Sequence, residues 1–125
     1  MTEPLIPPQL AAALAARDYV DLTPVQSAVL APAATGRDLL VSAQTGSGKT
    51  VAFGLAIALA LLEGKDRVGP PRVPLALVIA PTRELALQVQ TELEWLYAEA
   101  GARVVACVGG TDPRAERRQL DMGAH

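Results

Sequence analysis

Aromatic residues are scarce in this chain, which has one Trp, two Tyr and one Phe among its 125 residues. Few aromatics leave little surface on which nucleic-acid bases could stack. The core must instead be built from Ala, Val and Leu, since half of the residues are hydrophobic. A chain of this length has room for one domain of modest size. The composition therefore predicts a single globular layer structure with an aliphatic core.

The chain also has no large excess of positive or negative charge. The chain has 11 Lys and Arg against 13 Asp and Glu, which gives a net charge of −2. A protein that binds nucleic acid through a broad basic face is far more positive than this. Any contact with nucleic acid must therefore rest on a few placed groups.

Cysteine is almost absent, and Cys107 is the only one. An intrachain disulfide is thus excluded, which fits a reducing compartment and predicts a cytoplasmic location. Cys107 lies in an apolar run, 104–108, so we expect it to be a small buried hydrophobe. The apolar run from Val51 to Leu62 is shorter than the ~20 residues that cross a bilayer. We expect it to form a helix buried against a sheet, with no membrane partner.

The most informative stretch is a glycine-rich loop between two apolar segments, 38–42 and 51–55. Its residues are Ala43, Gln44, Thr45, Gly46, Ser47, Gly48, Lys49 and Thr50. Strand, glycine loop and helix in this order form the setting of a phosphate-binding P-loop, although the general pattern begins with Gly rather than Ala43. Backbone N–H groups and Lys49 would bind the phosphates, and the Thr50 hydroxyl would ligate Mg²⁺. The alternative is a glycine loop that merely turns a strand into a helix.

Strands and helices alternate along the rest of the sequence. Apolar runs predict strands at 38–42, 75–80 and 103–108. Capping residues and apolar spacing predict helices at 9–17, from Thr23 to Pro32, at 51–62, 83–100 and 112–122. This alternation is typical of an α/β fold with a parallel sheet flanked by helices. The sheet looks incomplete at its C-terminal side, because the last helix has no strand after it.

Three further segments, taken with the loop, resemble motifs of the DEAD-box ATP-dependent RNA helicases. Residues 19–26 resemble the Q motif of that family, residues 80–86 match its motif Ia, and Gly109-Gly110 is similar to its GG motif. The order and spacing agree over essentially the whole chain. The resemblance implies a P-loop NTPase, RecA-like domain, with N-terminal helices at 1–36 and the front part of the ATP-binding domain at 37–125.

The resemblance assigns roles that the local sequence leaves open. It implies that Tyr19, Thr23 and Gln26 belong to the ATP site, with Gln26 reading the adenine edge. On the sequence alone Gln26 could be the capping-box partner of Thr23, and Tyr19 a core aromatic. The family also stacks an aromatic on adenine, and counting back places that position near Met1.

The resemblance further implies that a few residues hold the sugar-phosphate backbone of RNA without reading its sequence. These are Pro81, Thr82, Arg83, Gly109 and Gly110. The alternatives are a capped helix start at Thr82 and an ordinary turn at the two glycines.

Several parts of the family pattern do not occur in these 125 residues. They are the Asp-Glu-Ala-Asp and Ser-Ala-Thr motifs and the second RecA-like domain. We therefore expect the front part of a first helicase domain, which alone is inactive, from an ATP-hydrolysing RNA helicase that uses ATP and Mg²⁺. The alternatives are a DNA helicase or translocase of the same superfamily and a non-catalytic nucleotide-binding module. The RNA target, protein partners and oligomeric state cannot be read from the sequence.

Overall fold

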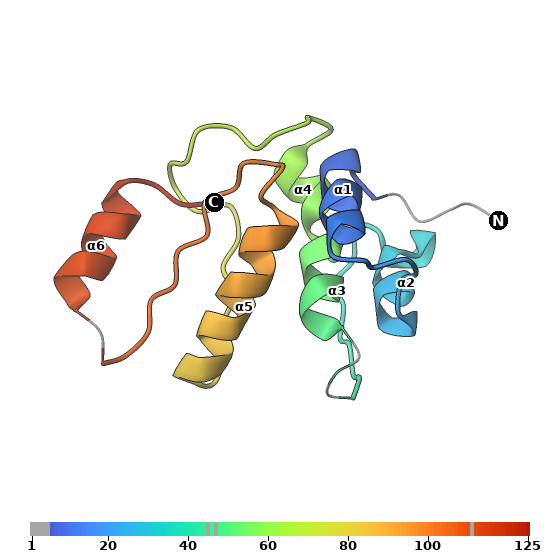
Figure 1. Ribbon diagram of the computed structural model, residues 1–125, viewed down its shortest axis with the longest axis horizontal. Coiled ribbons are helices and arrows are strands. Elements are labelled where there is room, and N and C mark those ends of the chain that lie inside the picture. Colours follow the sequence, from blue (N-terminus) through green and yellow to red (C-terminus); the bar gives the residue numbers. More distant parts are fainter. Residues whose placement is uncertain (1–5, 45, 47, 111) are drawn as a thin grey trace.

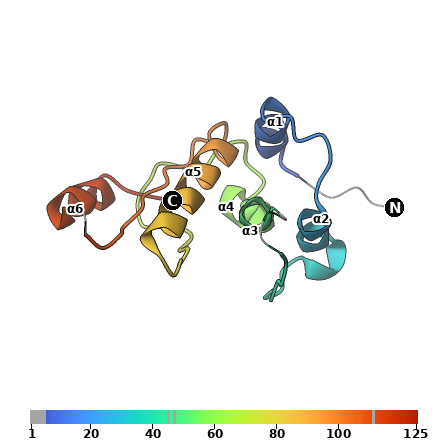
Figure 2. The same ribbon diagram turned by 60° about the horizontal axis from the view of Figure 1, so that its bottom comes forward.

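The computed structural model describes residues 6–44, 46, 48–110 and 112–125, and the statements below concern these residues. Five helices, α1 to α5, lie together, while α6 stands apart at the end of long irregular segments (Figures 1 and 2). The elements are α1 (Pro8–Ala16), α2 (Pro24–Leu30), a 3-10 turn (Pro32–Ala34), α3 (Lys49–Ala56), α4 (Ala58–Leu62), α5 (Arg83–Leu96) and α6 (Pro113–Asp121).

The predicted helix starts are confirmed by their caps. The Thr23 hydroxyl accepts from the Gln26 N–H at the start of α2, and the Gln26 side chain completes the capping box. Thr82 caps α5 by accepting the Leu85 N–H, and Asp112 caps α6. Pro32 ends α2 as expected, because proline cannot donate to the helix ladder.

The core lies between helices α1, α3, α4 and α5. Its buried residues are Leu10, Leu14, Val51, Leu55, Ala58, Leu62, Val89, Leu93, Leu96, Tyr97 and Ala100. Gly54 lets α3 approach α5, since a Cβ there would lie 2.7 Å from the Leu96 Cδ2 atom. The Tyr97 hydroxyl donates to the Gly54 carbonyl at 2.5 Å, and burial raises the pKa of the Tyr97 phenol. The aliphatic core is confirmed, but it is a contact between helices.

The three runs predicted as strands form no strand within the described residues. They contain no ladder, and the described chain has a single isolated antiparallel bridge, between Arg72 and Ala124. Leu40, Leu77 and Ile79 are 102%, 84% and 85% exposed. A strand requires a hydrogen-bonded neighbour about 4.8 Å away, and an apolar run that lacks one stays irregular. The parallel sheet thus stays a prediction.

Cys107 shares this outcome. It is exposed, so the prediction that it is buried was wrong. The prediction assumed that the apolar run 104–108 joins a sheet covered on both faces. Within the described residues no such layer covers Cys107.

Two predicted helices differ in extent from the observed ones. The run 51–62 forms two helices, α3 and α4, which meet at Ile57, and α3 begins at Lys49. Helix α5 ends at Leu96, and Gly101 follows with a φ of +73°. No helix among the described residues is long and apolar enough to cross a membrane.

The last residue joins two of the irregular runs. The His125 N–H donates to the Arg103 carbonyl at 3.0 Å. The His125 carbonyl accepts from the Leu75 and Ala76 N–H groups at 2.6 and 2.9 Å. The backbone of His125 therefore lies between the starts of the runs 75–80 and 103–108.

Candidate nucleotide and nucleic-acid site

The glycine-rich loop leads directly into α3. Gly46 and Gly48 both have a φ of +83°, a conformation that side chains with a Cβ rarely adopt. Gly48 is the N-cap residue, and Lys49 and Thr50 form the first turn of α3. The first N–H groups of a helix have no partner within it, so they are available to an anion. Thr45 and Ser47 were also predicted to bind ATP, and they lie outside the described residues.

The two residues with predicted catalytic roles differ in exposure. Lys49 is exposed, and no described residue bonds its ammonium group. Thr50 is half-buried beside it. The described residues contain no cluster of three or more His, Cys, Asp or Glu side chains that could hold a metal. One hydroxyl at a phosphate-binding loop fits Mg²⁺, because this ion keeps several waters and is otherwise held by phosphate oxygens.

Gln26 connects helix α2 to this loop. Its Oε1 accepts from the Thr23 N–H at 3.0 Å, and its Nε2 donates to the Gly48 carbonyl at 3.3 Å. The side chain is 0% exposed. A Cβ on Gly48 would overlap the Gln26 Nε2. The capping role is therefore confirmed, and its contact with Gly48 was not visible in the sequence, where 22 residues separate the two. The adenine-reading role stays a prediction, and it requires the amide to exchange these bonds.

Tyr19 packs against a residue of α5. Its ring centroid lies 5.7 Å from that of Trp95, with the planes inclined by 31°. The Arg17 guanidinium lies over the same Trp95 ring, 4.8 Å from its centroid. Tyr19 is half-exposed, and it also borders the hollow that contains Gly48 and Lys49. Tyr19 is thus a surface aromatic that contacts Trp95 and not a core residue, and its part in ATP binding stays a prediction.

A hollow of about 1720 Å³ brings distant segments together. Residues of α3 and α5 line it, together with Asp38, Leu39 and Val41. Gly46, Lys49 and Thr50 also border it, as do Ala80 and Pro81. The loop and the start of motif Ia thus border one space.

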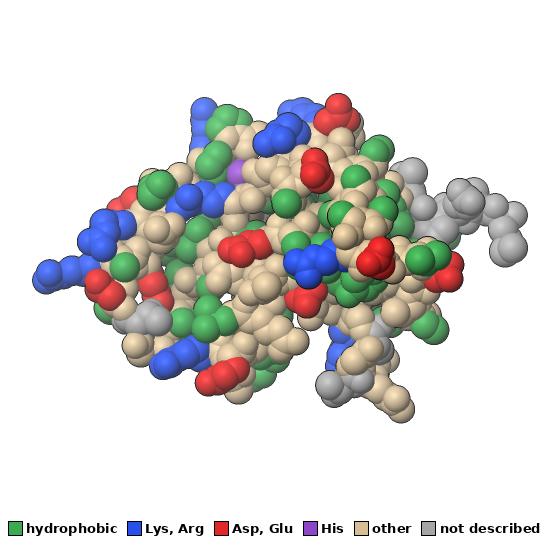
Figure 3. Space-filling view, in the orientation of Figure 1, with side chains coloured by type: hydrophobic (Ala, Val, Ile, Leu, Met, Phe, Trp, Pro, Cys, Tyr) green, Lys and Arg blue, Asp and Glu red, His purple; other side chains and the backbone are tan. Residues whose placement is uncertain are grey.

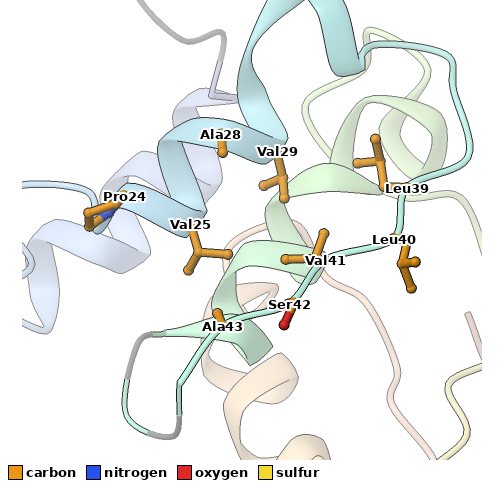
Figure 4. Close-up of a pocket in the computed structure, with 9 residues that line it drawn as sticks. All are labelled: Pro24, Val25, Ala28, Val29, Leu39, Leu40, Val41, Ser42 and Ala43. Atoms are coloured by element: carbon orange, nitrogen blue, oxygen red, sulfur yellow. The ribbon is translucent and has the colours of Figure 1, made fainter.

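A second cavity of about 560 Å³ lies between α2 and residues 39–43. In Figure 4, Val25 and Val29 of α2 lie toward Val41 of the facing segment, and Ser42 is the only labelled side chain with a polar oxygen. An apolar lining without cations does not suit a triphosphate. This cavity is a gap beside an unpaired apolar segment.

The residues predicted to hold RNA gather at the start of α5. Pro81, Thr82, Arg83 and both glycines of the pair at 109–110 are exposed. The Arg83 guanidinium lies against Gly110, where a Cβ would overlap it, and Gly110 has a φ of +81°. A Cβ on Gly109 would meet nothing within 4 Å. The structure thus brings Arg83 and Gly110 together across 27 residues, a contact that spacing alone does not reveal.

Comparison with known proteins gives a consistent result. The profile described as DEAD/DEAH box helicase matches residues 23–125. The chain is 42% identical over 119 residues to DEAD-box ATP-dependent RNA helicase 9 of Oryza sativa subsp. japonica, covering 94% of this chain and 18% of that protein. It is 41% identical over 106 residues to the ATP-dependent RNA helicase eIF4A of Eremothecium gossypii, covering 85% of this chain and 25% of that protein.

Solved structures show the same likeness. The RNA helicase Prp28 from Chaetomium thermophilum, bound to ADP, is 33% identical with a TM-score of 0.81, and the match covers 99% of this chain and 32% of that one. The yeast DEAD-box splicing factor Prp28 is 29% identical with a TM-score of 0.77, and the match covers 98% of this chain and 32% of that one. The chain therefore spans well under half the length of the relatives it matches, and these neighbours are RecA-like domains.

Proposed function

The chain belongs to the DEAD/DEAH box helicase family, and from this membership we propose that it is the ATP-binding front part of an RNA helicase. The intact protein couples ATP hydrolysis to the separation of RNA strands. Two observations carry the proposal. A glycine-rich loop with left-handed glycines opens α3, and Arg83, the first residue of α5, lies against Gly110.

The loop supports catalysis by charge stabilisation. The left-handed glycines leave the N–H groups of the first turn of α3 facing the loop, where they can donate to phosphate oxygens. The exposed Lys49 ammonium adds a positive charge that is solvated until phosphate arrives. Mg²⁺, held by the Thr50 hydroxyl and phosphate oxygens, supplies further charge neutralisation. Such groups accelerate phosphoryl transfer because they stabilise charge that develops in the transition state. The remaining catalytic groups belong to segments outside these 125 residues, so the chain alone is inactive.

The contact at Gly110 supports backbone recognition. Arg83 offers a forked set of donors that matches a phosphate, and its guanidinium lies in the space that a Cβ on Gly110 would fill. Neither group reads a base edge, so the binding is independent of RNA sequence.

We also propose that the α/β sheet forms in the intact protein. Its strands at 38–42, 75–80 and 103–108 pair with segments outside this chain. The apolar hollow of about 1720 Å³ separates the first two runs, and it has room for further strands between them. His125 bonds to the starts of both later runs, which marks the place of one such strand. We further propose a reducing compartment such as the cytoplasm, because Cys107 is a free, exposed thiol.

The experiment compares nucleic acids on the intact protein. ATP hydrolysis is measured with single-stranded RNA and with single-stranded DNA of the same sequence, and strand separation with the matching duplexes. The proposal predicts stimulation and unwinding with RNA and far less with DNA. Equal activity on DNA would favour a DNA translocase. Nucleotide binding without hydrolysis on either strand would favour a non-catalytic module.

A further inference from the structure

Helix α6 carries three arginines that the site above does not use. Arg114, Arg117 and Arg118 are all exposed. Residues three and four positions apart on a helix share a face, so the three guanidinium groups lie on one side of α6. The space-filling view shows Lys or Arg side chains projecting at this end of the molecule, with Asp and Glu side chains among them (Figure 3). We call these three residues the α6 basic face.

The α6 basic face has no protein partner in the described part of the chain. Among residues 6–44, 46, 48–110 and 112–125, no side chain or backbone group forms a hydrogen bond, ion pair or ring contact with these three side chains. Other arginines are engaged: Arg67 donates to the Glu99 carbonyl at 3.4 Å, and Arg103 donates to the Gln119 Oε1 at 2.6 Å. Free guanidinium groups held on one rigid element are available to an anionic ligand.

The acidic residues of this region do not neutralise that face equally. The Asp112 Oδ1 accepts the Arg114 backbone N–H at 3.0 Å, and the Glu116 Oε1 accepts the Val108 N–H at 3.0 Å. Both carboxylates thus accept from backbone amides, one in the segment before α6 and one in its first turn, and both keep their negative charge. Asp121 comes three residues after Arg118 and four after Arg117, so it lies on their side of α6. The α6 basic face therefore has three guanidinium groups and one carboxylate, a local excess of positive charge in a chain whose net charge is −2.

The position of α6 links it to the proposed RNA contacts. Its cap, Asp112, comes two residues after Gly110, which lies against the Arg83 guanidinium. An RNA strand bound at Gly110 would therefore pass close to the first turn of α6, because only a few residues of the protein separate the two. From Arg114 to Arg118 the helix rises about 6 Å, which is room for one or two phosphates.

We propose that the α6 basic face binds the phosphate backbone of single-stranded RNA beyond Arg83 and Gly110, so that the protein holds a longer strand. This inference rests on the proposed RNA-binding function. The contact is electrostatic and independent of sequence, because guanidinium groups on one helix face reach phosphates and no base-reading partner lies beside them.

The test uses the intact protein and fluorescence anisotropy with labelled single-stranded RNA. Strands of about 5 and about 15 nucleotides are compared, so that the shorter one covers little beyond Gly110. The variant Arg114→Gln/Arg118→Gln removes two charges and keeps good helix formers. The matched control Lys65→Gln/Arg72→Gln removes two charges from the exposed loop at 65–72. Arg114→Lys/Arg118→Lys preserves the charge.

The α6 variant should bind the long strand several-fold more weakly, with a salt slope shallower by about 0.7 to 1.4. Its affinity for the short strand should equal that of the control, and the Lys variant should keep most of the long-strand affinity. Equal long-strand affinity and slope in the α6 variant and the control would overturn the proposal. An equal loss of affinity for both strands would also overturn it, because that result indicates a structural effect. Unchanged RNA binding together with lost binding of an acidic protein partner would overturn it as well.

A separate variant distinguishes failure of the proposed function. Arg83→Gln should weaken both strands. If it weakens neither, the RNA-binding function itself is wrong. If it weakens both while the α6 variant weakens neither, only the extension along α6 is wrong.

Discussion

Gln26 shows how one residue can satisfy two interpretations of a sequence. Its amide completes the capping box with Thr23 and also donates to the carbonyl of Gly48 in the glycine-rich loop. The capping role was readable from local spacing. The contact with the loop was not, because it depends on how α2 packs on α3. An adenine that used this amide would compete for the bonds that hold the loop.

Replacing Gln26 with Ala should therefore have two effects in the intact protein. The helix loses its capping partner and the site loses a fully buried amide, so the free energy of unfolding should fall by about 1–3 kcal/mol. Selection of ATP over GTP should also weaken. Thermal unfolding and the affinities for both nucleotides measure the two effects. Unchanged base selectivity together with lower stability would leave only the structural role.

The glycine pair gives a sharper contrast at the same scale. Gly110 is left-handed and abuts Arg83, whereas a Cβ on Gly109 would meet open space. Gly110→Ala should lower the free energy of unfolding by about 1 kcal/mol or more and displace the Arg83 guanidinium. Gly109→Ala, the control, should change it by less than about 0.5 kcal/mol. Chemical denaturation of both variants checks this, and equal losses would refute the assigned geometry.

At the scale of elements, the helix starts were predictable from the sequence, whereas the strands stay predictions. Thr23, Thr82 and Asp112 mark helix starts by chemistry that acts within a few residues, so the sequence states it directly. The runs 38–42 and 75–80 have strand composition, but a strand also needs a neighbour, and no ladder forms among the described residues. The break at Ile57 between α3 and α4 had no marker in the sequence, since neither Gly nor Pro stands there.

The end of α4 carries a strained residue. Glu63 follows α4 with a φ of +50°, although it is not a glycine. Glu63→Gly should raise the free energy of unfolding by about 0.5–1 kcal/mol, because Gly adopts the left-handed conformation without steric cost. Glu94→Gly, inside the exposed face of α5, is the matched control and should lower it by about 1 kcal/mol. A loss of stability in both variants would contradict the strain at Glu63.

At the scale of the whole molecule, the exposed apolar runs are the dominant feature. Leu40, Leu77 and Ile79 face solvent, and Ile79 also borders the hollow that α3 and α5 line. Composition alone predicted their burial, and the likeness to RecA-like domains supports the proposal that they join a sheet. The rest of that layer could not be predicted from these residues, because its other members are not among them.

The 125-residue chain should consequently bind a hydrophobic dye. Fluorescence of anilinonaphthalene sulfonate should rise strongly with this chain and little with the intact protein, in which the sheet covers the apolar runs. Equal, weak fluorescence from both would mean that the runs are already covered, and the proposed sheet completion would be wrong.

We propose above all that the loop before α3 drives an RNA-dependent ATPase. The most direct measurement is RNA-stimulated ATP hydrolysis by the intact protein carrying Lys49→Ala, beside the control Lys65→Ala in an exposed loop. Loss of the charge-assisted phosphate contact removes about 1.5–3 kcal/mol in binding and more in the transition state. We predict turnover near background for Lys49→Ala, with unchanged thermal unfolding, and normal turnover for the control. Turnover by Lys49→Ala within about twofold of the unmodified protein, a difference of about 0.4 kcal/mol, would contradict the account.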